Sequence, residues 1–347
     1  MLKYFSLFIL VLLLHSCSES PTAVPYSVPW QEVNNGLPDY GFGGFHYSNV
    51  KCIAFNGNTI FAGCNEGVYT SSDDGNSWTA KNTGLPDKGL PDKPYVNCIA
   101  VKDNIVFIGT DGHGVFRSTD NGNSWISKNI DTIHTNVKSI AIKDNYIYVG
   151  TRNGIFVSSD NGENWTDNGN QWTAKENAIP GTDINSIVPF ENEIYVAART
   201  FGVYKSSDNC NSWKETTGVE LLSPVSPNCL TINDNTFYIG TDIGTFLSTD
   251  KGKTWTSKNL GSQLNNLGPF VNCIAAKGKT LIIGTIDNGV FLSTDKGENW
   301  KEIGPYTMYS PNPQIYSPWV FSIIVHNDYV FVASNYGVHK APLSEFR

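Results

Sequence analysis

The chain has 347 residues, of which 40% are hydrophobic and only 16% are charged, and it contains 32 glycines. This composition excludes a disordered chain and suits a large packed β protein. The formal net charge of −8 leaves no basic field for a phosphate backbone, so we expect no nucleic acid partner.

The N-terminus has the features of a targeting segment. One Lys precedes an apolar run from Tyr4 to Leu14, which is too short to span a bilayer and suits the core of a signal peptide. The run leads into LHSC, ending at Cys17, which resembles the lipobox of bacterial lipoproteins. That resemblance implies cleavage before Cys17 and a membrane anchor attached to it. A plain secretory signal with an incidental Cys is the alternative.

These features predict three segments. We expect a lipoprotein signal peptide at residues 1–16, a flexible Ser/Pro-rich tether at 17–27 and one folded domain at 28–347. The expected location is the cell envelope, at the outer membrane or cell surface, with a secreted or periplasmic protein as the alternative.

An octet of the form S-x-D-x-G-x-(S/T/N)-W recurs along the chain. It occurs six times, ending at Trp78, Trp125, Trp165, Trp213, Trp255 and Trp300. The octet resembles the Asp-box, or BNR, motif of sialidase-like, sortilin-like and photosystem II assembly factor-like proteins. The resemblance covers nearly all of the chain after the tether, and it implies a β-propeller.

A second marker gives the number of blades. A small residue within a short apolar strand recurs seven times, at Cys52, Cys98, Ser139, Ser186, Cys229, Cys273 and Ser322. A polar turn, an alternating strand, a Gly-led third strand and the octet follow each of the first six. We therefore predict an all-β fold, a single seven-bladed β-propeller of four-stranded antiparallel blades.

The last unit ends without an octet or a fourth strand. Near the N-terminus, Trp30 stands six residues before Gly36, as Trp78 stands six before Gly84. We expect residues 28–34 to supply the missing strand of blade seven and so close the ring.

The octet carboxylates are predicted to be structural. They belong to Asp73, Asp120, Asp160, Asp208, Asp250 and Asp295. Each is expected to accept backbone N–H groups in its turn, while the Gly takes a positive φ and the Trp is buried. Glycoside hydrolysis needs two carboxylates ~5–10 Å apart, and calcium needs about six to eight oxygens, whereas each octet lies on a different blade. A bound ion remains the minor alternative, and no metal or cofactor is expected.

Ligand contacts are expected on the opposite face, where loops converge. Arg152 and Arg199 fall in loops of neighbouring blades, and Asp111 and His113 fall in the blade before them. They form a polar rim or, alternatively, are solvated loop residues. The sialidase resemblance implies an arginine triad, yet the whole chain holds four arginines, and no catalytic residue is assigned.

Six cysteines follow Cys17. Four of them occupy the recurring small position where other blades carry Ser, so we expect buried free thiols.

Two loops before blades one and seven concentrate aromatic side chains. The candidate contact residues are Tyr40, Phe42, Phe45, His46, Tyr47, Tyr306, Tyr309, Tyr316 and Trp319. Exposed, they would suit a protein or a sugar; folded over one another, they would form a plug. Both readings stay open.

The stretch SSDNGENWTDNGNQWTAK, 158–175, repeats part of the octet, with Trp residues at Trp165 and Trp172. We interpret it as a local duplication that lengthens one turn, and which Trp is buried stays open.

The function predicted is that of a lipid-anchored, monomeric, non-catalytic scaffold for an envelope protein or a glycan. Two alternatives are a glycoside hydrolase of the sialidase or xyloglucanase-like type, and an assembly factor for a membrane complex, as resemblance to photosystem II assembly factors implies.

Overall fold

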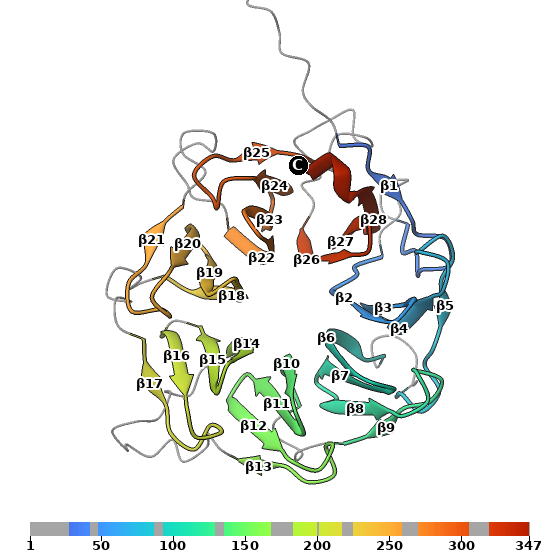
Figure 1. The fold of residues 1–347 in the computed structure, drawn as a ribbon. Coiled ribbons are helices and arrows are strands. Elements are labelled where there is room, and N and C mark those ends of the chain that lie inside the picture. Colours follow the sequence, from blue (N-terminus) through green and yellow to red (C-terminus); the bar gives the residue numbers. More distant parts are fainter. Residues whose placement is uncertain are drawn as a thin grey trace, which may run out of the picture.

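A computed structural model describes residues 28–41, 48–86, 93–128, 135–167, 183–199, 201–216, 225–258, 270–304 and 319–346. Seven four-stranded antiparallel sheets surround a central axis, as the view down that axis shows (Figure 1). The predicted seven-bladed β-propeller is therefore confirmed.

Blades one to four follow one another in the chain, each running from the axis outward. Blade one holds β2 (Cys52–Asn56), β3 (Thr59–Cys64), β4 (Gly67–Ser71) and β5 (Thr79–Ala80). Blade two holds β6 (Tyr95–Lys102), β7 (Ile105–Asp111), β8 (Val115–Ser118) and β9 (Ile126–Ser127). Blade three holds β10 (Val137–Lys143), β11 (Tyr146–Thr151), β12 (Gly154–Ser158) and β13 (Thr166–Asp167). Blade four holds β14 (Ile184–Phe190), β15 (Glu193–Ala198), β16 (Gly202–Ser206) and β17 (Lys214–Glu215).

Blades five to seven complete the ring. Blade five holds β18 (Pro227–Asn233), β19 (Thr236–Thr241), β20 (Gly244–Ser248) and β21 (Thr256–Ser257). Blade six holds β22 (Phe270–Lys277), β23 (Thr280–Ile286), β24 (Val290–Ser293) and β25 (Lys301–Glu302). Blade seven holds β26 (Val320–His326), β27 (Tyr329–Ser334), β28 (Gly337–Pro342) and β1 (Gln31–Glu32), and a 3-10 turn η3 (Leu343–Phe346) follows β28.

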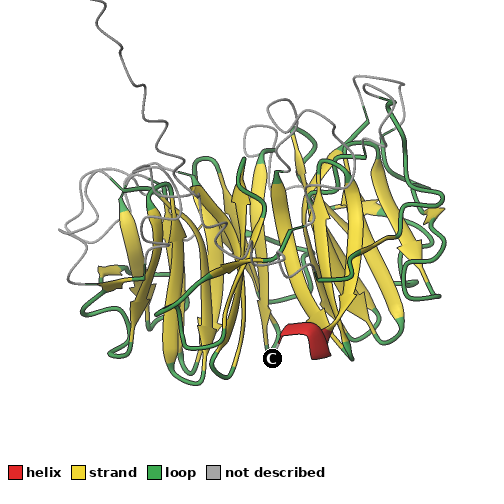
Figure 2. Cartoon of the chain, turned by 90° about the horizontal axis from the view of Figure 1, so that it is seen from above, coloured by secondary structure: helices red, strands yellow, loops and turns green. Residues whose placement is uncertain are grey.

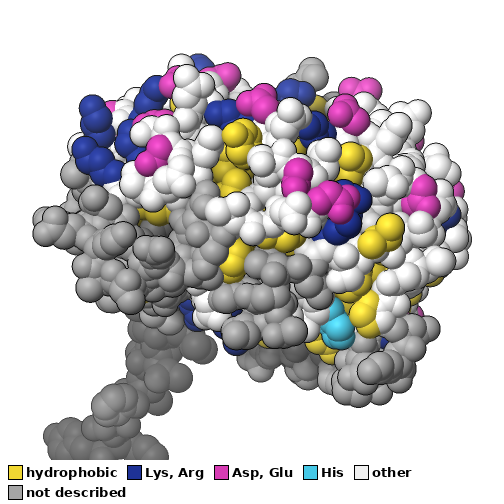
Figure 3. Space-filling model, turned by 90° about the horizontal axis from the view of Figure 1, so that it is seen from below, with side chains coloured by type: hydrophobic (Ala, Val, Ile, Leu, Met, Phe, Trp, Pro, Cys, Tyr) yellow, Lys and Arg dark blue, Asp and Glu magenta, His cyan; other side chains and the backbone are white. Residues whose placement is uncertain are grey.

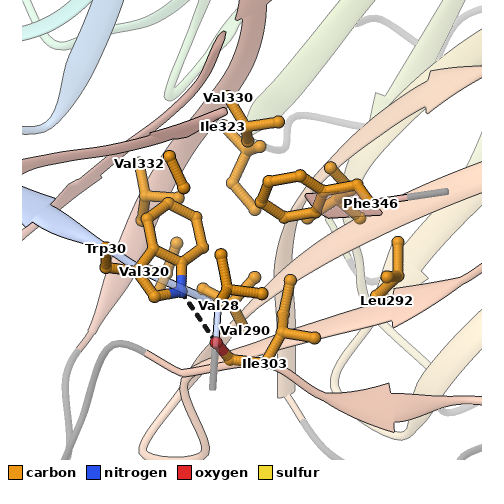
Figure 4. Close-up of a cluster of buried hydrophobic side chains, with 12 residues drawn as sticks. Val28, Trp30, Val290, Leu292, Ile303, Val320, Ile323, Val330, Val332 and Phe346 are labelled. Carbon is orange, nitrogen blue, oxygen red and sulfur yellow. Dashed lines mark hydrogen bonds between the residues drawn. The ribbon is translucent and has the colours of Figure 1, made fainter. Parts of the chain in front are cut away.

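The N-terminal strand closes the ring, as predicted. In blade seven, Gln31 pairs with Lys340 and Glu32 with His339, so β1 is the outer strand beside β28. The Trp30 indole N–H donates to the Ile303 carbonyl of blade six at 2.7 Å (Figure 4). The first and last described strands, β1 and β28, therefore lie side by side in one sheet.

Hydrophobic packing between blades holds the ring together. The second strands are almost wholly buried, because each lies inside its sheet and between two neighbouring sheets. The inner strands keep partial exposure along much of their length, so solvent-accessible surface remains near the axis. Figure 4 shows one inter-blade cluster, in which Trp30 meets the Phe346 ring edge-on with centroids 5.6 Å apart.

Candidate functional site

The ring has two faces with different construction. One, here called the octet face, carries the octets and the turns between first and second strands; the other, the loop face, carries the second-to-third-strand loops and the links between blades (Figure 2). Charged side chains gather toward the octet face in the side view of Figure 3. There, Glu163 pairs with Arg117 at 2.6 Å and with Lys128 at 2.5 Å.

The octets share one hydrogen-bonding pattern, described here for the first of them. The Asp73 carboxylate accepts the Ser77 amide at 2.9 Å and the Ser77 hydroxyl at 2.6 Å. The Ser71 hydroxyl donates to Asp73 at 2.7 Å and accepts the Gly75 amide at 2.9 Å. Equivalent bonds hold Asp120, Asp160, Asp208, Asp250 and Asp295. Each carboxylate is thus bound within its own turn.

These bonds stabilise the ionised carboxylates. Hydrogen bonds from the Ser77 and Ser71 hydroxyls and the Ser77 amide lower the pKa of Asp73 from 3.8 to about 2. The matching bonds from Ser124 and Ser118 lower the pKa of Asp120 to about 2. An acid catalyst needs the opposite shift, so the octet aspartates are unsuited to donate a proton at neutral pH.

The turn requires a left-handed backbone two residues after each Asp. Gly75 has φ 85°, and in the fourth octet Cys210 holds the same place with φ 69° and is fully buried. A Cβ is disfavoured there, so Cys210 is a strained substitution. Burial raises the pKa of its thiol, and the six described cysteines are all unpaired.

The octet Trp residues connect neighbouring blades. The Trp78 indole donates to the Val33 carbonyl at 2.7 Å, and the Trp125 indole to the Lys81 carbonyl at 2.8 Å. Trp165 does the same to Lys128 at 2.9 Å and is half-buried. Of the duplicated pair, Trp165 therefore makes the inter-blade contact, while Trp172 lies outside the described residues.

On the loop face, two predicted arginines meet at one carboxylate. Arg152 Nε lies 3.8 Å from Asp183 Oδ1, and Arg199 Nη1 lies 3.4 Å from Asp183 Oδ2. Both arginine side chains are about 60% exposed, whereas that of Asp183 is 12% exposed. Asp183 directly precedes β14 and was not expected from the sequence, because no repeat marks it.

Asp111 and His113 do not join the arginine pair. Asp111 accepts a hydrogen bond from the Asn136 side chain, and the Gly112 and Gly114 amides donate to the Thr135 carbonyl at 3.1 and 2.9 Å. This loop of blade two is therefore fixed to the link that leads into blade three. His113 Nδ1 is buried and has no hydrogen-bond partner among the described residues.

Trp319 is anchored although the residue is 45% exposed. Its indole N–H donates to Asp287 Oδ1 at 2.6 Å, and its amide donates to Asn335 Oδ1 at 2.9 Å. The Asn335 carbonyl also accepts the Asn49 amide at 3.3 Å. The described ends of the two aromatic loops therefore meet at Asn335.

Tyr40 lies beside a charged pair that the sequence did not indicate. Lys93 Nζ is 3.4 Å from Glu66 Oε2. Burial and the Glu66 carboxylate raise the pKa of Tyr40 well above its ordinary value. Tyr40 thus keeps its proton at neutral pH.

The remaining candidate residues lie outside the described part of the chain. They are Cys17, Phe42, Phe45, His46, Tyr47, Tyr306, Tyr309 and Tyr316.

Large exposed apolar side chains concentrate on the loop face. Its members are Tyr40, Tyr95, Phe201, Ile243, Phe270 and Trp319, each at least 36% exposed. Tyr40 and Trp319 lie in blade-to-blade links, and Phe201 and Ile243 lie in second-to-third-strand loops. Tyr95 and Phe270 are the first residues of the inner strands β6 and β22, at the loop-face end. Ile126, on the outer strand β9, is the other exposed large apolar residue among those described. This distribution marks the loop face as the candidate contact surface.

Among the described residues, no group of three His, Cys, Asp or Glu side chains could hold a metal ion. No helix within that part of the chain is long and apolar enough to cross a membrane.

Comparison with known proteins supports the fold. Residues 185–316 match the family model described as the DUF6242 beta propeller domain. No curated protein sequence matches the chain significantly.

Solved structures resemble the whole ring at low sequence identity. The BT4673 extracellular domain from B. thetaiotaomicron is 18% identical over 88% of this chain and 40% of its own, with a TM-score of 0.68. The GH74 xyloglucanase from Xanthomonas campestris is 16% identical over 92% of this chain and 54% of its own, with a TM-score of 0.67. This chain thus spans less than two thirds of either protein. YCF48 bound to D1 peptide is 14% identical over 90% of this chain and 95% of its own, with a TM-score of 0.66.

Proposed function

We propose that this chain is a lipid-anchored propeller of the Asp-box type that acts as a non-catalytic binding scaffold in the cell envelope. The carrying observation is the concentration of exposed apolar side chains on the loop face. Exposed aromatic residues are the side chains that most often anchor protein contacts, and Tyr and Trp also stack on sugars. The occupant is therefore an envelope protein or a glycan.

The octet geometry supports the Asp-box assignment and argues against catalysis on the octet face. Each octet Asp is bound within its own turn and has a lowered pKa. Such groups stabilise the blades and are not free to act on a substrate.

The envelope location is supported by the lipobox-like sequence ending at Cys17 and by the likeness to an extracellular domain. YCF48, a single propeller of comparable length, is recorded with a bound peptide. A propeller of this size therefore provides enough surface for a peptide contact.

The proposed contact is tested with two matched exposed residues. Trp319→Ala removes a loop-face side chain, and Ile126→Ala removes one from an outer strand. Partner capture after crosslinking in the native envelope should fall for Trp319→Ala, and for Tyr309→Ala if that loop takes part, while the melting temperature is kept. Ile126→Ala should leave capture unchanged. Lost stability with unchanged capture would show that the aromatic loops form a plug.

The hydrolase alternative is disfavoured by the arginines. Arg152 and Arg199 both face the carboxylate of Asp183, so their charge is already partly compensated. Release of sugar from sialylated or β-glucan substrates, abolished by Arg152→Ala or Arg199→Ala, would contradict the non-catalytic proposal.

A further inference from the structure

One position at the start of the inner strands carries different residue types in different blades. It directly precedes the recurring small residue, at the loop-face end of the strand, and is here called the axial position. In blades two, four, five and six it holds Asn97, Asn185, Asn228 and Asn272.

The four asparagines have a shared structural role. Each side-chain amide donates to a backbone carbonyl of the next blade: Asn97 to Val137 at 2.9 Å, Asn185 to Pro227 at 3.0 Å, Asn228 to Val271 at 3.2 Å and Asn272 to Val320 at 2.9 Å. These bonds tie adjacent blades together around the axis.

Blades one and three carry lysine at the axial position, and blade seven carries Phe321. In blade three the Ser139 hydroxyl donates to the next blade's Ile184 carbonyl at 2.9 Å, so Lys138 is not needed for that bond. In blade one the Cys52 thiol lies 3.7 Å from the Val96 carbonyl. The two lysines therefore stand where four other blades carry Asn, but they do not make the hydrogen bond to the next blade that Asn makes.

Lys51 lies in an unfavourable place for a positive charge. Its ammonium is half-buried and sits 3.5 Å from the centroid of the Phe321 ring. Burial and the positive charge of Lys138 lower the pKa of Lys51 to about 8. Among the described residues, no carboxylate lies within ion-pair distance of either ammonium. A bound anion would offset both the partial burial of Lys51 and its repulsion by Lys138.

The surroundings of the pair favour a peptide as the source of that anion. The Phe321 ring meets Trp319 edge-on with centroids 6.5 Å apart. Phe321 therefore lies between Lys51 and the exposed Trp319 on the loop face. The other exposed residues on this face include Phe201, Ile243 and Phe270. Such a mixture of aliphatic and aromatic groups suits peptide side chains, whereas sugars favour flat aromatic platforms.

We propose that Lys51 and Lys138 together bind a carboxylate of an acidic peptide segment at the loop-face end of the propeller axis. The proposal deepens the scaffold function and rests on it for the class of ligand. The two ammonium groups supply charge-assisted hydrogen bonds to the carboxylate, and the neighbouring aromatic rings contact the adjoining peptide.

The chain itself supplies the test variants. Lys51→Asn and Lys138→Asn place at each site the residue that four other blades carry, so the ring should fold. Lys277→Asn is the control, because Lys277 ends an inner strand on the octet face and is exposed. It removes the same charge far from the axial position.

The probes are acetate and two blocked tripeptides, N-acetyl-Gly-Glu-Phe-amide and the same peptide with Gln in place of Glu. Each probe is titrated into the full chain. Binding is measured by calorimetry and by NMR of the lysine ammonium groups. We expect acetate to shift the Lys51 and Lys138 signals, and the Glu peptide to bind at least about tenfold more tightly than the Gln peptide. Each axial Lys→Asn change should weaken the Glu peptide about tenfold, and the double change should abolish the preference for Glu. Lys277→Asn should bind like the unaltered chain.

Three results would overturn the proposal: equal affinity for the two peptides, unchanged Glu binding in the double variant, or no response to acetate or the Glu peptide. Binding of glucuronate or inorganic phosphate without the Glu peptide would overturn the peptide assignment. If Trp319→Ala abolishes capture but the acetate site is absent, only the carboxylate proposal fails. If acetate binds and capture does not depend on Trp319, only the scaffold function fails.

Discussion

At the scale of single residues, the octet Asp is a local organiser of the backbone. Its two carboxylate oxygens accept hydrogen bonds from the backbone amide and from the hydroxyl or side-chain amide of the residue four positions later, and the preceding Ser hydroxyl also donates to the carboxylate. The sequence predicted this role because the spacing recurs six times. Recurrence at one place in a repeating fold indicates architecture, whereas chemistry needs one special place.

The first octet provides a matched pair for testing that role. Asp73→Asn should lower the free energy of unfolding by about 1 kcal/mol, because charge-assisted hydrogen bonds become neutral ones. Asp74→Asn should have no effect, since Asp74 is exposed and Asn tolerates its φ of 57°. Urea denaturation measures both, and equal losses would contradict the assigned role.

The lowered pKa values also predict acid sensitivity. Asp73 and Asp120 have a pKa of about 2 in the folded chain against an ordinary 3.8, so the unfolded state binds more protons between these values. Their contribution to stability is present above pH 4 and should be lost as pH falls from about 4 to 2. The stability difference between the unaltered chain and Asp73→Asn should shrink over that window, as measured by urea midpoints. A difference that stays constant would contradict the shift.

Lys51 differs from these carboxylates because its charged form destabilises the folded chain at neutral pH. Its folded pKa of about 8 lies below the ordinary 10.5, so its charge costs stability at neutral pH. Lys51→Asn should therefore stabilise the chain at pH 7, by about 1 kcal/mol if the new amide also donates to the Val96 carbonyl. The stability advantage of Lys51→Asn over the unaltered chain should narrow as pH rises from 8 toward 10, because Lys51 then loses its proton. Lys138 and Cys52 are present in both proteins and do not account for the difference. Destabilisation at pH 7 would show that Lys51 has a structural role.

At the scale of elements, the two-residue strand β1 closes the whole ring. Its own ladder is short, so the adjoining Trp30 carries much of the closure through burial and its bond to Ile303. The sequence predicted this strand because Trp30 repeats the spacing of Trp78 to its following Gly. The exact register could not be predicted from that spacing, since it depends on contacts with β28.

Shortening Trp30 tests the closure. Trp30→Ala should cost about 3–5 kcal/mol and should increase amide hydrogen exchange first in β26 to β28 of blade seven. Trp30→Phe keeps most of the burial and should cost less, roughly the value of the lost hydrogen bond, ~1 kcal/mol. A uniform rise in exchange over all blades, with blade four affected as much as blade seven, would contradict local closure.

The loops mark the limit of what the sequence could predict. Loop residues do not repeat, so nothing in the chain indicated that Asp183 would bridge Arg152 and Arg199, or that Asp287 would hold Trp319. These partners are brought together by neighbouring blades. The axial lysines were readable in principle, because aligning the seven inner strands shows Lys in two blades where four carry Asn.

At the scale of the whole molecule, the two faces differ in the residues that they carry. The octet face is occupied by bound carboxylates and ion pairs, and the loop face carries the exposed apolar residues and the axial lysines. The ring closes through its own N-terminal strand, so no described blade lacks its outer strand. We therefore expect partners to bind to the loop face alone.

Site-specific photocrosslinking in the native cell envelope tests that claim most directly. A photoreactive phenylalanine is placed at Trp319 or Ile243 on the loop face, and at Lys277 or Lys296 on the octet face, with equal expression and melting temperature verified for each. We expect both loop-face positions to crosslink to the same partner and the octet-face positions not to crosslink. Crosslinking of that partner from the octet face, or from both faces equally, would contradict it.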